Sequence, residues 1–184
     1  MEKWKISDLV YGVLIPTVVG FTIIGIEMSS SPLFIGLKYT LLEAIVVVGV
    51  PMLVGLIWNQ WAGGTAGFIM GSFYGLYFSD QLCAAQNLGD ISLLGNLVSA
   101  MLIGYIAGAL NKRSDSYRRM LISGIIAGTV ASLPLLFTSQ YSKVLGGLTV
   151  GGAVLALLPR IFAAVVMPLI ARAFLRHAAK QETS

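Results

Sequence analysis

Polar and ionisable side chains suited to binding a small molecule gather near the ends of long apolar runs in this sequence. Carboxylates, carboxamides and an arginine can hydrogen-bond a ligand, and tyrosine rings can stack on it. A charge held at membrane depth costs about 2.5–3.5 kcal/mol, so each such group is a candidate for function. The candidate ligand-binding residues are Tyr39, Glu43, Tyr74, Tyr77, Asp80, Gln81, Asn87, Asn96, Gln140 and Arg160.

Three of these residues share one face of a helix. Tyr74, Tyr77 and Gln81 lie at positions i, i+3 and i+7, which a helix brings to the same side. Two rings and a carboxamide suit a flat heterocycle that needs stacking and a few directed hydrogen bonds. The alternative is that the two tyrosines anchor the helix at the membrane interface, where aromatic side chains are enriched.

Glu43 and Arg160 are ionisable residues inside or beside apolar runs. Glu43 lies about one turn inside its run and needs a cation, which is Arg160, Lys38 or a group on a ligand. Arg160 follows Pro159 at the start of the last run. It either extends to the interface as a topological anchor or holds a carboxylate or phosphate of a ligand.

The sequence offers no complete catalytic or metal-binding set. His177, the single histidine, lies in a basic tail, and Cys83, the single cysteine, lacks a second thiol for a disulfide or a Cys-based metal cluster. No HExxH, GxSxG or Walker motif occurs. We therefore predict a protein that is not an enzyme and holds no cofactor or metal. An intramembrane lipid-modifying enzyme that uses Asp80 with Asp90 stays open as a minor alternative.

The elements that position these residues are membrane-spanning helices. Of the 184 residues, 57% are hydrophobic and 11% are charged, whereas about 25% are charged in a soluble domain. Backbone groups cannot stay unpaired in lipid, so apolar runs of about 20 residues must be helices. We predict an all-α integral membrane protein with one transmembrane domain over 1–184. Its six spans are expected at about 8–27, 39–58, 63–79, 91–110, 119–138 and 157–176.

The distribution of cations predicts that both termini are cytoplasmic. With the N-terminus inside, only Lys38, Lys143 and Arg160 of the twelve Lys and Arg residues fall outside, as the positive-inside rule requires. The candidate ligand-binding residues then form a cup at the outer end. Between the helices of the inner half we expect almost no polar residue. The location is the cell membrane, and nucleic acid is excluded because no basic patch has interleaved aromatics.

Small residues recur at every fourth position in four of the spans. Such ridges allow close helix approach, either within this chain or with a partner. In the first span we predict a partner-docking face, formed by Gly12, Pro16 and Gly20. The other ridges are Gly63, Gly67, Gly71 and Gly75; Ala100, Gly104 and Gly108; and Gly124, Gly128 and Ser132.

Residues 139–156 lie before the last span and hold four glycines among apolar residues. This composition suits a re-entrant or lid-like loop folded against the outer end of the bundle.

The layout resembles the substrate-binding (S) component of an energy-coupling factor (ECF) vitamin transporter. The most suggestive stretches are Gly63–Phe68 with Gly71, Gly95–Leu97 through Gly108 to the pair Lys112 and Arg113, and Leu157–Arg160. The resemblance implies a six-helix protein that captures a vitamin-like molecule from outside. It also implies a membrane coupling subunit and two ATPase subunits as partners, with all ATP hydrolysis in those subunits. In the first helix this chain departs from the family, which has an alanine pair four residues apart where Gly12, Pro16 and Gly20 stand here.

A second functional class fits the same composition. Helices with glycine ridges can assemble into homo-oligomers, and such an assembly would act as a channel or a secondary transporter. Flux through liposomes that contain this protein alone would separate this class from a capture subunit.

Overall fold

The computed structural model describes residues 13–14, 16–18, 21, 43–78, 91–141 and 150–182, and every regular element in them is helical. A π-helix, η3, begins the second predicted span and continues directly into α4. Four longer helices follow, joined by turns or by segments outside the described residues. The elements are η3 (Glu43–Gly49), α4 (Val50–Ile57), α5 (Gln60–Phe78), α6 (Ile91–Asn111), α7 (Tyr117–Gln140) and α8 (Val150–Glu182).

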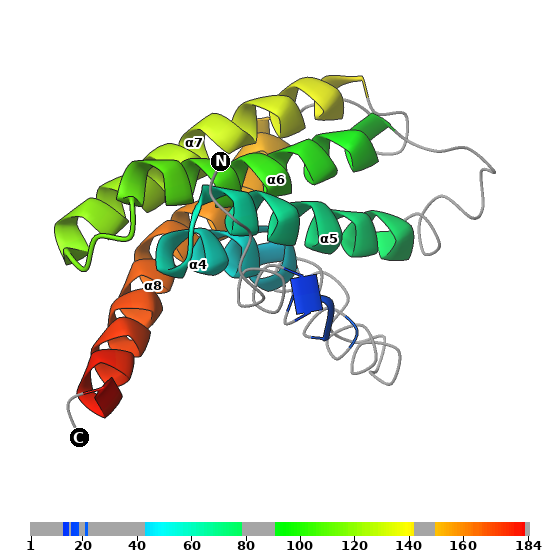
Figure 1. Cartoon of the computed structure of the whole chain (residues 1–184). Coiled ribbons are helices and arrows are strands. Elements are labelled where there is room, and N and C mark those ends of the chain that lie inside the picture. The colour runs from blue at the N-terminus through cyan, green and yellow to red at the C-terminus, as the bar shows by residue number, and fades with distance from the viewer. Residues whose placement is uncertain are drawn as a thin grey trace, which may run out of the picture.

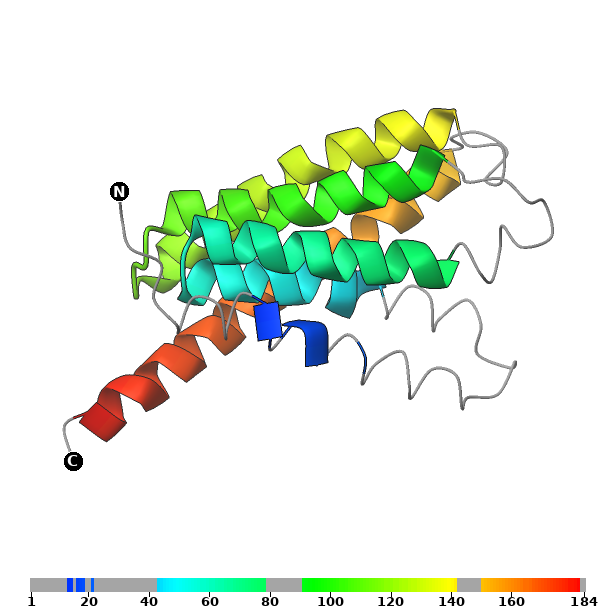
Figure 2. The same cartoon turned by 45° about the vertical axis from the view of Figure 1, so that its right-hand side comes forward.

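These helices form one bundle in which sequence neighbours are also neighbours in space. α5 packs on α6 and α6 on α7, while α4 lies against α5, α6 and α8 (Figures 1 and 2). The C-terminal part of α8 projects away from the other helices (Figure 2). We call the end where α6 begins the Glu43 end, and the end with the α6–α7 turn the Lys112 end. Only the short turn 112–116 joins α6 to α7, so the two helices are antiparallel neighbours.

Three helices are long and apolar enough to cross a membrane, namely Leu93–Asn111, Tyr117–Gln140 and Leu157–Leu175. Their outward faces carry large apolar side chains such as Phe137 and Ile161, which suit lipid contact. The chain is therefore an all-α, multi-pass membrane protein. Glu43–Ile57 is a shorter apolar helix, and α5 is less apolar because it contains five glycines. Six spans remain a prediction.

The predicted spans at 63–79, 91–110 and 119–138 agree closely with α5, α6 and α7, but the stretch 139–156 does not form one loop. Ser139 and Gln140 end α7, and Val150–Ala156 already belong to α8. The loop prediction was therefore wrong in its limits, because glycines do not break a helix in an apolar solvent that demands paired backbone groups. Residues 142–149 lie outside the described residues.

The prolines are accommodated within the helices. α7 continues through Pro134, and α8 through Pro159 and Pro168, because spans in lipid cannot leave their backbone unpaired. At Pro51 the accommodation is more specific. The π-helical turns of η3 end at Gly49, and Pro51 lies in the first turn of α4, where a missing backbone N–H is tolerated. The wider winding before it suits the proline ring, which would otherwise clash with the preceding turn.

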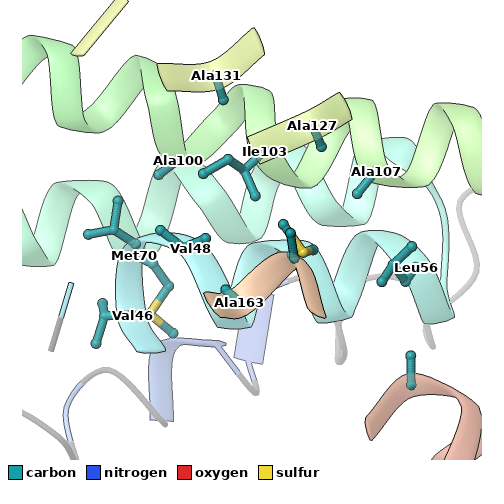
Figure 3. Close-up of a cluster of buried hydrophobic side chains, with 14 of the residues drawn as sticks. Val46, Val48, Leu56, Met70, Ala100, Ile103, Ala107, Ala127, Ala131 and Ala163 are labelled. Atoms are coloured by element: carbon teal, nitrogen blue, oxygen red, sulfur yellow. The ribbon is translucent and has the colours of Figure 1, made fainter. Parts of the chain in front are cut away.

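The core is built from alanines and a few larger apolar side chains. Ala100, Ala107, Ala127 and Ala131 of α6 and α7 face Val48 and other residues of the π/α helix (Figure 3). Small side chains bring the helix axes close together, which is how helices in lipid gain dispersion energy. The core therefore runs between α6, α7 and the η3–α4 helix.

The glycine ridges of α5 and α6 pack against each other. A Cβ atom at Gly67 would lie 2.2 Å from the carbonyl oxygen of Ala100, and one at Gly63 would lie 2.4 Å from that of Gly104. A Cβ atom at Gly55 of α4 would lie 2.2 Å from the same Gly104 oxygen. Three backbones thus converge where no side chain fits. These ridges therefore pack against one another inside the chain and do not form an external face.

Candidate functional site

A buried ion pair joins α8 to the start of η3 near the Glu43 end. Nη1 of Arg160 lies 2.7 Å from Oε1 of Glu43 and donates a hydrogen bond to it. Nη2 of Arg160 donates a second hydrogen bond to Oγ of Ser99 on α6, at 3.2 Å. The structure thus selects Arg160 as the cation for Glu43, from the three alternatives that the sequence left open.

Arg160 is deep in the bundle. Its side chain is 1% exposed, and the residue lies ten positions after the start of α8, or about 15 Å along the helix axis. This burial does not fit the alternative of an anchor that extends to the interface, because Glu43 and Ser99 hold the guanidinium between helices. A guanidinium stays charged even when buried, so the site holds a permanent positive charge that Glu43 neutralises.

Glu43 is the more accessible member of the pair. Its side chain is 17% exposed, and it stands in the first turn of the π-helix. An approaching polar molecule would therefore meet the carboxylate before the guanidinium. The combined charge of the pair is zero, which reduces the cost of keeping it in an apolar environment.

Asn96 lies one helical turn before Ser99 on the same face of α6. It is 7% exposed, and within the described part of the chain its Oδ1 has no hydrogen-bond partner. A buried amide oxygen without a donor is costly, by roughly 1–3 kcal/mol. Asn96 is thus an acceptor that a bound molecule with an N–H or O–H group can satisfy.

Tyr74 of α5 also faces the interior. It is 4% exposed and belongs to the main apolar core, so it is not an interface-belt anchor. Tyr77 lies in α5 as well, but its side chain is outside the described residues. Whether the two share a ligand with Gln81 therefore remains a prediction.

The other candidate ligand-binding residues are not brought to this ion pair by the described structure. Gln140 ends α7 and is exposed. Ser99 was missed by the sequence reasoning, although its i+3 spacing from Asn96 was a usable signal. Outside the described residues lie Tyr39, Asp80, Gln81 and Asn87.

Pro16 does not lie on an open face of the first span. It is fully buried, whereas Leu14, Val18 and Phe21 of the same span are exposed. The centre of the Phe21 ring lies 4.8 Å from the centre of the Phe73 ring on α5. One member of the predicted docking face is therefore covered within the chain, and the docking face as a whole stays a prediction. The other two members of that face, Gly12 and Gly20, lie outside the described residues.

The Lys112 end, which is the inner end in the predicted topology, carries a buried polar contact between helices, an exception to the expectation that the inner half has almost none. Asn111 is fully buried and its Nδ2 donates to the carbonyl oxygen of Leu56 at 2.9 Å. Asn59 accepts a hydrogen bond from the backbone N–H of Ala62 and thereby caps α5. Asn111 was overlooked because it is the last residue of its helix, where sequence alone suggests solvent.

Comparison with protein-family models, with curated proteins and with solved structures gives no match. The resemblance to ECF substrate-binding components therefore rests on the sequence layout.

The chemistry available at the ion pair is recognition by charge and hydrogen bonds. Among the described residues, no three His, Cys, Asp or Glu side chains come together as metal ligands. The described site has two kinds of acceptor, the Glu43 carboxylate and the Asn96 amide oxygen, around a guanidinium already engaged by Glu43. This arrangement fits a molecule that donates hydrogen bonds.

Proposed function

We propose that this protein is the membrane-embedded substrate-capture subunit of an ECF-type importer, which binds a small vitamin-like molecule at the Glu43 end. In this proposal the chain crosses the membrane six times with both termini in the cytoplasm, and the Glu43 end faces outward. Coupling and ATP hydrolysis belong to a separate membrane subunit and two ATPase subunits.

The observation that carries the proposal is the buried ion pair between Arg160 and Glu43, which joins two apolar helices. A buried ion pair is weak evidence for stability, because well-packed apolar residues often stabilise a fold as much or more. Ionisable residues within spans mark ligand or ion pathways more often than structural supports. The pair therefore supports a recognition function at this end of the bundle.

The unsatisfied acceptor of Asn96 supports a ligand with N–H donors. A nitrogen heterocycle or amide can donate to Asn96 and to the exposed side of Glu43, while its ring contacts the apolar walls. An anionic ligand is less well supported, because Glu43 already neutralises Arg160 and would repel a second carboxylate.

A thermal-shift screen of water-soluble vitamins, combined with native mass spectrometry of gently purified protein, tests this function. We expect one nitrogen-containing compound to raise the midpoint of unfolding and to co-purify with the wild-type chain. The variants Glu43→Gln and Asn96→Ala should lose that shift, whereas Thr129→Ala should keep it, since Thr129 is on the exposed face of α7 and bonds only to Ile125 within its own helix.

Two results would count against the capture subunit. An empty screen with wild-type protein that is folded and free of bound compounds removes the basis for it. Substrate flux through liposomes that contain this chain alone would favour the stand-alone channel or carrier, since a capture subunit requires its partners for transport.

A further inference from the structure

Arginines from α7, from α8 and from the turn between α6 and α7 gather at the Lys112 end, far from the ion pair. Arg113 and Arg119 flank the α6–α7 turn and are exposed, and Arg172 of α8 lies nearby with its guanidinium carbon 5.6 Å from the centre of the Tyr117 ring. Lys112 and Arg118 are exposed in the same segment. Asp115 is the single acidic residue of this turn, so the surface is strongly cationic.

Two of these arginines are held in place by their own Nε atoms. Nε of Arg113 donates to the carbonyl oxygen of Trp58 at 2.5 Å, and Nε of Arg119 donates to that of Leu110 at 3.0 Å. Both carbonyls end helices, α4 and α6. In the described structure neither arginine uses its Nη groups for a protein hydrogen bond, so the outer edge of each guanidinium is presented to the surroundings.

The stacking of Arg172 on Tyr117 orients a third guanidinium in the same way. Guanidinium groups with fixed orientation bind phosphate oxygens through paired N–H donors, and less side-chain entropy is lost on binding. The first turn of α7 adds backbone donors, because the hydroxyl of its N-cap residue, Ser116, makes no capping hydrogen bond. The turn is thus a preorganised anion site.

The position of the turn indicates the source of the anion. α6 has 21 residues, which is about 31 Å of helix and matches the thickness of the hydrocarbon layer. The turn after it must then lie at the level of lipid headgroups. Trp61, which is 60% exposed, packs edge-on against Tyr105 on the outer surface near this end, as aromatic side chains do at the membrane interface.

We propose that the Lys112 end binds the phosphate of an anionic phospholipid, held by Arg113, Arg119 and Arg172 and attracted by Lys112 and Arg118. The alternative role of these arginines is purely structural, as caps of the carbonyls of α4 and α6. The two roles predict different lipid preferences. A phosphate site retains anionic lipids better than zwitterionic ones, whereas arginines that only cap carbonyls give no such preference.

Native mass spectrometry of detergent-solubilised protein with added phosphatidylglycerol or phosphatidylcholine tests the proposal. We expect preferential retention of phosphatidylglycerol, weakened about five-fold for each cation removed. Arg119→Gln is the direct variant, but it also removes the cap on Leu110. Lys112→Gly avoids this difficulty, because Lys112 has a left-handed backbone with φ of 49° that glycine adopts readily. It should weaken retention without lowering the midpoint of thermal unfolding.

A variant with the opposite sign and a neutral control complete the design. Asp115→Asn should strengthen phosphatidylglycerol retention, and Thr129→Ala should leave it unchanged. Equal retention of the two lipids by wild-type protein, or no response to either Lys112→Gly or Asp115→Asn, would overturn the proposal. Displacement of the lipid by an equimolar amount of inorganic phosphate would also overturn it, by showing a site for free phosphate.

Discussion

Nη1 of Arg160 lies 2.7 Å from Oε1 of Glu43, although 117 positions of sequence separate the two residues. The contact joins the last helix to the first turn of η3 and places a neutralised charge pair inside an apolar bundle. Ser99 holds the second amino group of the arginine from a third helix. The pair therefore links three elements inside the bundle, where a single unpaired charge would be costly.

Breaking this pair is expected to destabilise the protein more than replacing it. Glu43→Gln or Arg160→Met alone leaves an uncompensated polar group and should lower the free energy of unfolding by about 3–5 kcal/mol. The double variant Glu43→Leu with Arg160→Met should recover most of that loss and still fail to bind ligand. Unfolding in detergent, followed by circular dichroism, measures both effects. A double variant whose loss equals the sum of the two single losses would show that the side chains are not coupled, and this would contradict the observed ion pair.

Asn96 is expected to lower the stability of the free protein and to strengthen ligand binding. Because its buried Oδ1 lacks a donor in the described structure, Asn96→Leu should leave the midpoint of unfolding unchanged or raise it. The same change should weaken binding of the ligand found in the vitamin screen by roughly ten-fold, the equivalent of one hydrogen bond of about 1.5 kcal/mol. Isothermal titration gives the affinity, with Thr129→Ala as the control. A marked drop in stability would mean that Asn96 has a structural partner.

Gly67 and Gly75 belong to the same ridge and should respond oppositely to alanine. A Cβ at Gly67 would meet the Ala100 carbonyl oxygen at 2.2 Å, whereas one at Gly75 meets nothing within 4 Å. Gly67→Ala must push α5 away from α6 and should cost about 1–3 kcal/mol. Gly75→Ala should gain about 0.5–1 kcal/mol, because alanine loses less backbone entropy in a helix. Thermal unfolding of the two variants compares them directly, and equal losses would contradict the observed helix packing.

Asn111 is expected to be a structural tie between α4 and α6. Its Nδ2 donates to the Leu56 carbonyl near the end of α4, so Asn111→Ala leaves that carbonyl without a donor and should cost about 1–3 kcal/mol. Asn111→Asp should be worse at neutral pH, because a carboxylate cannot donate and would face the carbonyl oxygen. Unfolding midpoints in detergent rank the three proteins. An aspartate variant as stable as wild type would exclude the hydrogen bond.

Much of the helical layout could be predicted from the sequence. The runs from Ile91 and from Tyr117 became α6 and α7 within two or three residues of the predicted limits, because an apolar run in lipid must pair its backbone locally and has no other choice. α8 was the exception at its start. Its glycines suggested a loop, but the chain pairs its backbone through them, and Arg160 moved inward as a result.

The candidate site was predicted only in part. Glu43 and Arg160 were both identified from their charge and apolar surroundings. An ionisable residue in such a run is costly, which makes it a candidate for function. Their pairing with each other was one alternative among three. Ser99 escaped notice although it lies three residues after Asn96, and Asn111 because the last residue of a helix is expected to meet solvent.

The sequence by itself determined that this is a helical membrane protein and which residues carry costly charges, because both depend on local composition and on the solvent. Only the tertiary structure decided which of those residues meet. That choice depends on how each helix is rotated about its axis and how closely it approaches its neighbours. The glycine contacts at Gly55, Gly63 and Gly104 set such distances between α4, α5 and α6, and the fold of the last helix against η3 brings Arg160 to Glu43.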